Sequence, residues 1–214
     1  LGLNTLLETN AVRLTSPEKI KLDNLGVRAS IDGSEKIHNY IRSKNLGGNP
    51  YRVSLENLAR AKGLGIPVQI TCSVNSLNHN SIYQMVKEIV AYGLDDIRLR
   101  LSMPAGFAIK NWSELGMSRY ELLEVRRQEK RIKKDFPFIN FNAASLKRSK
   151  PKFEPKFFID PRGFVKPYPF IEHFVGNLNE ESVTSILEKI LSFQLPVSEE
   201  RRMVNYLITL EMIE

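Results

Sequence analysis

The amino-acid sequence predicts an α/β fold in which parallel strands form one sheet with helices packed on it. Three β-prone runs lie at residues 27–31, 68–74 and 96–101, and the stretches between them have helical character and end near glycine. Strands that alternate with helices through short connections are typical of β-α-β units. A chain of 214 residues is long enough for one such domain and a small appendage.

The first two expected strands flank a short helix. Residues 3–11 are apolar with threonine and form the first strand. Ser16 can cap a helix that begins at Pro17, where the missing N–H of proline has no cost, and this helix continues to Gly26. The second strand, residues 27–31, follows directly. This part of the chain therefore predicts the first β-α-β unit.

Two further helices and two further strands complete the expected sheet. A helix at residues 51–62 precedes the third strand at residues 68–74, and a helix at residues 81–91 precedes the fourth strand at residues 96–101. The order is then β-α-β-α-β-α-β. On the first of these helices the expected inner face consists of Val53, Leu55, Leu58 and Ala59.

The second half of the chain changes in pattern. We expect an amphipathic helix at residues 118–136, a fifth strand at residues 138–141, a hairpin around Asp160-Pro161-Arg162 and a final helix at residues 180–192. The expected apolar positions of the first helix are Tyr120, Leu123, Val125 and Ile132. The expected domains are a barrel-like domain at residues 1–146, a Lys/Pro-rich linker at 147–156 and an extension at 157–214.

Charge and cysteine content limit the possible functions. The formal net charge is +7, and the densest basic cluster, residues 126–134, is interpreted as a solvated helix face, so nucleic-acid binding is not expected. The single cysteine, Cys72, excludes an intrachain disulfide and a multi-cysteine metal site, and it fits a cytoplasmic protein. No apolar run approaches the ~20 residues of a membrane helix.

Polar side chains follow the ends of the expected strands, where ligands collect in parallel α/β sheets. Hydroxyls, amides and carboxylates at these ends suit a ligand with ribose hydroxyls and an amino-acid end. Each such residue alone is more often part of a turn, but four strand ends together favour a site. The candidate binding residues are Thr9, Asn10, Ser30, Asp32, Asn75 and Arg98.

Seven short motifs occur in a fixed order over residues 1–110. They are Thr9-Asn10-Ala11, Ser30-Ile31-Asp32-Gly33, His38 with Ile41-Arg42, Val53-x-x-x-Asn57-Leu58, Gly65-Ile66-Pro67-Val68, Asn78 to Asn80, and Pro104-Ala105-Gly106. In their order and spacing they resemble the radical S-adenosylmethionine (SAM) superfamily, in the branch with peptide-modifying and cofactor-maturing enzymes. Ala11 stands where that family usually has glycine.

The resemblance implies a partial (β/α) barrel of parallel strands, that is, a TIM-like half barrel, with a small C-terminal extension. Residues 157–167 resemble the start of a SPASM-like extension, in which Tyr168 replaces a cluster cysteine. The implied cofactors of the parent protein are S-adenosylmethionine and a [4Fe-4S] cluster. The family's Cys-x-x-x-Cys-x-x-Cys loop is not in this sequence, so we expect neither cofactor to be held by this chain alone.

The resemblance also implies a function. The parent enzyme would reductively cleave S-adenosylmethionine to modify a peptide or a cofactor precursor, with an electron-donor protein as partner, and this chain alone would be inactive. No catalytic residue and no metal ligand is assigned. By motif count the chain begins at the third barrel strand, so the open edge at residues 3–9 is expected to pair with a second copy.

Two other classes of function remain open at this point. One is a non-catalytic half-barrel that binds a peptide or protein partner. The other is a phosphate-binding α/β protein that uses Arg98, Arg100 and Lys110, although the sequence has no Gly-rich phosphate loop. The three histidines lack the sequence context of a catalytic triad.

Overall fold

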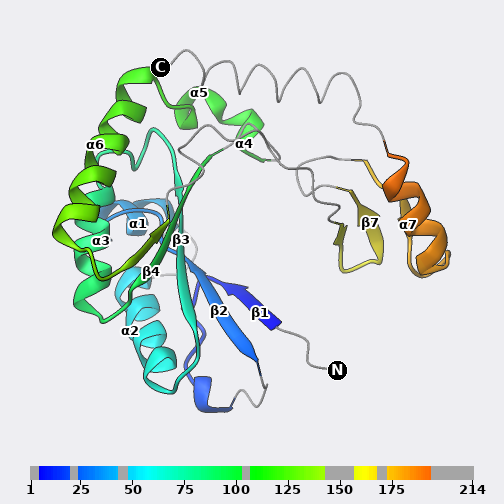
Figure 1. Ribbon diagram of the computed structural model, residues 1–214, viewed down its shortest axis with the longest axis horizontal. Helices are drawn as coiled ribbons and strands as arrows, with labels where there is room; N and C mark the ends of the chain where they lie inside the picture. Colours follow the sequence, from blue (N-terminus) through cyan, green and yellow to red (C-terminus); the bar gives the residue numbers. More distant parts are fainter. Residues whose placement is uncertain are drawn as a thin grey trace. The chain divides into compact units, whose positions relative to one another are not determined.

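Five strands, all parallel, form one sheet in the order β1-β2-β3-β4-β5 (Figure 1). The predicted α/β class is confirmed. Strands β3 and β4 have the predicted bounds, whereas β2 begins two residues earlier than expected. The strands are β1 Thr5–Thr9, β2 Leu25–Ser30, β3 Val68–Val74, β4 Asp96–Leu101 and β5 Asn140–Asn142.

Helices lie against one face of this sheet, as Figure 1 shows. On β2, β3 and β4 alternate residues face them and are buried, as Val27, Ile70 and Ile97 are. Helix residues such as Leu55 and Ile89 complete this core. The opposite face of the sheet, here called the open face, therefore carries the other half of the strand residues. The helices are α1 Glu35–Arg42, α2 Pro50–Gly63, α3 Ile82–Ala91 and α6 Arg119–Asp135.

This computed structural model describes residues 5–19, 24–42, 48–102, 107–142, 157–167 and 173–193. The chain divides into two compact units. The first is Leu1–Ser102 with Ser113–Lys147, and the second is Met103–Trp112 with Arg148–Glu214. The expected linker at 147–156 lies outside the described residues. The domain boundaries drawn from the sequence stay a prediction.

The second unit contains a small antiparallel sheet of β6 Phe158–Ile159, β7 Phe164–Lys166 and β8 Gly176–Asn177. Asp160 forms the turn between the first two strands, because its Oδ1 accepts hydrogen bonds from the backbone N–H groups of Arg162 (2.8 Å) and Phe164 (3.0 Å). The predicted hairpin is confirmed. Further helices are α4 Phe107–Lys110, α5 Trp112–Leu115 and α7 Val183–Leu191.

Four sequence-based expectations were wrong in detail. Val53 and Tyr120 are exposed rather than on the inner faces of their helices, because Ser54 and Leu122 occupy the buried positions beside them. Phe138 is exposed and precedes β5 instead of forming it. The helix expected from Pro17 to Gly26 is not found as such. A 3-10 turn covers Pro17–Lys19, residues 20–23 are not described, and β2 already includes Gly26.

The basic cluster of residues 126–134 lies on α6, and several of its charges are paired within that helix. Arg127 contacts Glu124 (Nη1 to Oε2, 3.2 Å), Arg131 contacts Asp135 (Nε to Oδ2, 3.4 Å), and Lys133 contacts Glu129. Ion pairs three and four residues apart are typical of a solvated helix face. None of the described helices is long and apolar enough to cross a membrane.

Gly33 provides a test of the turn between β2 and α1. Its φ is +129°, and an added Cβ would lie 2.9 Å from both Ile37 Cγ2 and Ser81 Oγ. We expect Gly33→Ala to lower the free energy of unfolding by about 2 kcal/mol, because the substitution adds backbone strain to a steric clash. Urea denaturation measures this change.

Gly63→Ala is the matched control, because Gly63 lies in α2 with no atom within 4 Å of an added Cβ. It should leave stability unchanged or raise it by less than about 1 kcal/mol. Equal losses in the two variants would contradict the steric role of Gly33.

Candidate functional site

The loops that follow β1, β2 and β3 lie at the same edge of the sheet. The register Thr9↔Ala29 and Ser30↔Thr71 brings the carboxyl ends of these strands together. Of the six predicted binding residues, Thr9, Asn10, Ser30, Asp32 and Asn75 lie at these ends. Arg98 lies within β4, two strands from Ser30 in the same row. The predicted clustering at strand ends therefore matches the topology for five residues.

The loop after β1 uses the side chains of Thr9 and Asn10 for its own turn. The backbone N–H of Ala11 donates to Thr9 Oγ1 (3.0 Å), and that of Val12 donates to Asn10 Oδ1 (3.2 Å). Ala11 is fully buried with a φ of 60°, which explains why the resembling family favours glycine here. Among the described residues, no hydrogen bond donated by the Thr9 hydroxyl or the Asn10 amide NH₂ is found.

Side chains of helix α2 form hydrogen bonds to the loop after β1. Ser54 Oγ donates to the carbonyl oxygen of Asn10 (2.7 Å), and Asn57 Nδ2 donates to those of Ala11 (2.9 Å) and Val12 (3.3 Å). Ser54 and Asn57 are buried, and these bonds pair their polar groups with carbonyl oxygens of the loop. The sequence analysis included Asn57 only as part of a motif and missed Ser54.

Asp32, His38 and Arg42 form a polar cluster after β2. Arg42 Nε donates to Asp32 Oδ2 (2.5 Å), and the backbone N–H of Asp32 donates to His38 Nδ1 (3.0 Å). Nδ1 is thus an acceptor, which places the proton of the neutral ring on Nε2. Nε2 is buried without a hydrogen-bond partner in the described part of the chain, and the ring meets Tyr51 edge-on with centroids 5.4 Å apart. Burial lowers the pKa of His38 to about 4, although the charge of Asp32 acts in the opposite direction.

Asn78 joins the loop after β3 to the loop after β2. Its Oδ1 accepts from the backbone N–H of Asn75 (2.9 Å), and its Nδ2 donates to the carbonyl oxygens of Ser73 (2.9 Å) and Asp32 (3.2 Å). The side chain of Asn75 is used within the same turn, where Oδ1 accepts from the backbone N–H of Leu77 (2.9 Å). Asn78 is fully buried, so this amide acts as an internal brace.

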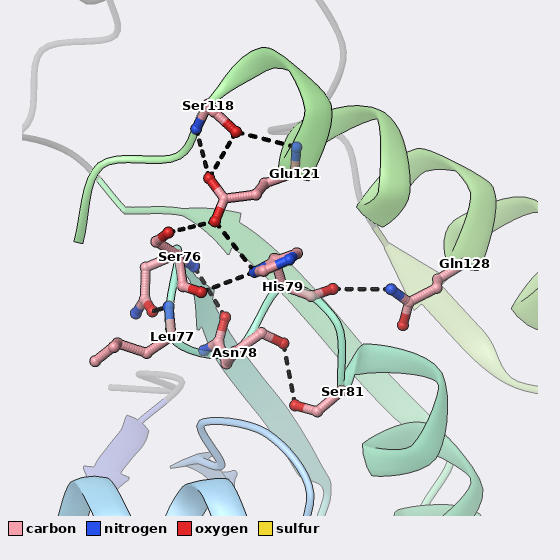
Figure 2. A network of polar contacts seen from close by, with 9 residues as sticks. Ser76, Leu77, Asn78, His79, Ser81, Ser118, Glu121 and Gln128 are labelled. Atoms are coloured by element: carbon pink, nitrogen blue, oxygen red, sulfur yellow. Dashed lines mark hydrogen bonds and ion pairs between the residues drawn. The ribbon is translucent and has the colours of Figure 1, made fainter. Parts of the chain in front are cut away.

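Helix α6 fixes the other side of the same loop (Figure 2). Glu121, in the first turn of α6, accepts a hydrogen bond from the Ser76 hydroxyl, and its Oε1 lies 3.5 Å from His79 Nδ1. Gln128 Nε2 donates to the carbonyl oxygen of His79 (2.8 Å). Burial raises the pKa of Glu121, but the hydrogen bonds from Ser76 and Ser118 outweigh it and the pKa is lowered. An ionised Glu121 therefore ties the loop to α6.

Polar residues on the open face form three rows across the strands. The first row is a continuous hydrogen-bonded chain. Arg28 donates to Glu8 Oε1 (from Nη1, 2.7 Å) and to Gln69 Oε1 (from Nε, 2.7 Å). Gln69 Nε2 in turn donates to Asp96 (3.1 Å to Oδ2). The second row contains Ser30, Thr71 and Arg98, and the third contains Ser73 and Arg100.

A cavity of about 510 Å³ lies at the opposite, amino ends of β2, β3 and β4. Its lining includes Arg28, Gln69 and Asp96 of the first row, together with Lys62 and Asp95, which pair with each other (2.7 Å). The charged groups of the cavity are thus already satisfied. It contains none of the six predicted binding residues, and we do not assign it a ligand.

The described residues do not provide a metal centre. No group of three or more His, Cys, Asp or Glu side chains that could hold a metal is found within them. Cys72 is fully buried in β3, and burial raises the pKa of its thiol well above the ordinary value. An iron-sulfur cluster needs several accessible thiolates, so the residues of this chain do not fit one.

Comparison with known proteins identifies relatives of this fold. No protein-family model matches the chain. The sporulation killing factor maturation protein SkfB of Bacillus subtilis (strain 168) is 21% identical over 173 residues, which cover 77% of this chain and 41% of that protein. The chain therefore spans less than half the length of this curated relative.

Solved structures show the same fold. Native anSMEcpe with bound AdoMet has a TM-score of 0.67 at 16% identity, covering 88% of this chain and 57% of that chain. The complex of anSMEcpe with AdoMet and the Cp18Cys peptide has the same TM-score at 17% identity, covering 88% and 59%. Streptococcus suis SuiB bound to S-adenosylmethionine has a TM-score of 0.61 at 12% identity, and the match covers 87% of this chain and 48% of that chain. The α/β fold implied by the sequence resemblance is therefore confirmed.

Replacing Asn78 tests the brace between the two loops. We expect Asn78→Ala to lower the free energy of unfolding by about 3 kcal/mol, because it leaves several buried backbone groups without partners. Urea denaturation provides the measurement. Asn80→Ala, an exposed position in the same loop, should change stability by less than about 0.5 kcal/mol. A loss at Asn78 no larger than at Asn80 would contradict the bracing role.

His38 makes stability depend on pH. As pH falls through 6.5 the unfolded chain takes up a proton on this imidazole, whereas the folded chain does so only near pH 4, so acid favours unfolding. We expect this residue to contribute a loss of about 2 kcal/mol in unfolding free energy between pH 7 and pH 5.

The measurement is urea denaturation at both pH values for the wild-type chain and for His38→Gln. The variant should lack this part of the pH dependence even if it is less stable at pH 7. An identical drop in both proteins would show that His38 is not the titrating group.

Proposed function

We propose that this chain is the S-adenosylmethionine-contacting part of a radical SAM enzyme that modifies a peptide. The observation that carries the proposal is the placement of hydroxyl, amide and carboxylate groups at the shared carboxyl edge of β1 to β3, in a fold found in structures solved with AdoMet. In parallel α/β sheets this edge is where ligands bind. SkfB, by its name, and the anSMEcpe complex with Cp18Cys support a peptide as substrate.

The six predicted residues take different parts in this proposal. No hydrogen bond of the Ser30 hydroxyl is seen within the described ranges, so it is available to a ribose hydroxyl or a carboxylate. Asp32 is held by Arg42 and the Asn10 amide projects from a fixed turn, so both are positioned to orient the cofactor. Thr9 and Asn75 shape the turns around it. Arg98 provides positive charge in the row of Ser30.

The chemistry of the parent enzyme depends on a [4Fe-4S] cluster, which would supply the electron for cleavage of S-adenosylmethionine. Because Cys72 is single and buried, we propose that thiolates outside these 214 residues hold the cluster, and that an electron-donor protein reduces it. In this proposal the chain itself contacts and orients the cofactor. A cytoplasmic location remains part of the proposal.

The second candidate is a half-barrel that binds a peptide or protein partner without catalysis. The buried thiol of Cys72 favours it, because the chain's own residues offer no cluster ligand. An edge-strand homodimer also remains a proposal. It is supported by the position of β1 at the end of the sheet, where residues 5–8 are exposed.

A titration of the 214-residue chain with S-adenosylmethionine, followed by amide NMR, tests the proposed function. We expect millimolar binding, because the proposal places the metal anchor of the amino-acid end outside the chain, with shifts concentrated at residues 9–11 and 30–34. Ser30→Ala should weaken binding about threefold to tenfold, the loss of about one hydrogen bond. Thr184→Ala, which removes an exposed hydroxyl in the second unit, should leave it unchanged.

Two results would count against the proposal. The absence of any shift at 10 mM S-adenosylmethionine would remove the cofactor-binding role and favour the non-catalytic alternative. Shifts confined to the residues of the amino-end cavity, such as Gly65 and Gln69, would place the ligand at the wrong edge of the sheet.

A further inference from the structure

The three rows of the open face differ in how well their polar groups are satisfied. In the first row, the charges of Glu8, Arg28 and Asp96 are linked through Gln69 into one hydrogen-bonded chain. In the second row, Thr71 Oγ1 and Arg98 Nε are buried and have no hydrogen-bond partner among the described residues. Buried polar groups normally form hydrogen bonds. The polar groups of the first row do so with one another, whereas Thr71 Oγ1 and Arg98 Nε of the second row do not.

Thr71 and Arg98 are direct neighbours. They face each other in the register of β3 and β4, and Ser73 faces Arg100 in the next pair on the same face. Thr71 is only 8% exposed. Leaving its buried hydroxyl without a hydrogen bond therefore costs free energy. Two hydroxyls and two guanidinium groups thus lie in a two-by-two arrangement across adjacent strands.

The charges in this arrangement have one sign. Within the described ranges neither Arg98 nor Arg100 forms an ion pair, and Glu8, the acid that acts on Arg100, is already bound to Arg28. Burial first, and then the positive charges of Arg28 and Arg98, lower the pKa of Arg100. An anion between the guanidinium groups would relieve this repulsion and satisfy Arg98 Nε and Thr71 Oγ1 at the same time.

We propose that Arg98 and Arg100, with the hydroxyls of Thr71 and Ser73, bind a carboxylate of the peptide substrate, either an acidic side chain or the terminal carboxyl group. The identity of the substrate as a peptide rests on the proposed function. Arginine suits this task because its planar fork meets both oxygens of a carboxylate. The amino-acid end of S-adenosylmethionine carries the same group, so the experiment separates the two sources.

The experiment uses the full chain with ¹⁵N label, including the arginine side-chain signals. Two probes that differ in one charge are titrated separately: N-acetyl-Gly-Glu-Gly-amide and N-acetyl-Gly-Gln-Gly-amide. We expect the Glu peptide to shift the Arg98 and Arg100 Nε–H signals and to bind at least about tenfold more tightly than the Gln peptide, the range of one charge-assisted contact.

The double variant Arg98→Gln/Arg100→Gln should lose this preference for the Glu peptide. The matched control, Arg119→Gln/Arg127→Gln, removes the same net charge from exposed positions on α6 and should retain it. If the double variant does not fold, Arg100→Gln alone, at an exposed position, should still lower the preference at least threefold.

Equal affinity for the two peptides, or a preference that survives in the folded double variant, would overturn the proposal. So would displacement of the Glu peptide by S-adenosylmethionine, because the anion bound there would then be the cofactor's carboxylate. The proposed function is tested separately by the signals of residues 9–11 and 30–34. If these fail to respond to S-adenosylmethionine while the Glu preference holds, the cofactor role fails and the carboxylate site stands.

Discussion

The buried amide of Asn78 joins the loops after β2 and β3, and the geometry of the candidate site depends on it. A parallel sheet places the carboxyl ends of its strands at one edge, but the loops there must satisfy their own backbone groups before they can present side chains to a ligand. Asn78 does this for two loops at once, through Asn75, Ser73 and Asp32. Helices α2 and α6 brace the same edge through Asn57 and Glu121. The predicted binding residues are thus held in place by residues that were not predicted to bind a ligand.

Strand positions could be predicted from the sequence, whereas helix faces could not be predicted fully. Residues 68–74 and 96–101 were predicted as strands, the first because it is a strongly β-prone run, and both match the observed strands. Val53 was misplaced because the buried side of α2 carries Ser54 and Asn57, whose polar groups bind loop carbonyls. The periodicity of apolar residues within a helix cannot predict such hydrogen bonds, because the acceptors lie more than 40 residues away in the chain.

The same limit applies to the site. Strand-end chemistry identified Thr9, Asn10, Ser30, Asp32 and Asn75, and the topology brings these ends together. Which atoms remain available was not predictable, because the turns use Thr9 Oγ1, Asn10 Oδ1 and Asn75 Oδ1 as acceptors. Thr71 and Ser73 escaped notice because a hydroxyl within a strand has no sequence signature of its own. Their importance depends on the register with Arg98 and Arg100.

The hydrogen-bonded row of Glu8, Arg28, Gln69 and Asp96 also bears on how the sheet assembles. Sliding β2 past β3 by one residue would turn Arg28 toward the apolar helices and expose Val27, because side chains alternate between the two faces. Sliding it by two residues would keep the faces correct but would separate Arg28 from Gln69 and from its ion pair with Glu8. Hydrophobic patterning cannot reject that second error, whereas the charged row can. The hydrogen bonds of the row therefore favour the observed alignment of β2 over an alignment shifted by two residues.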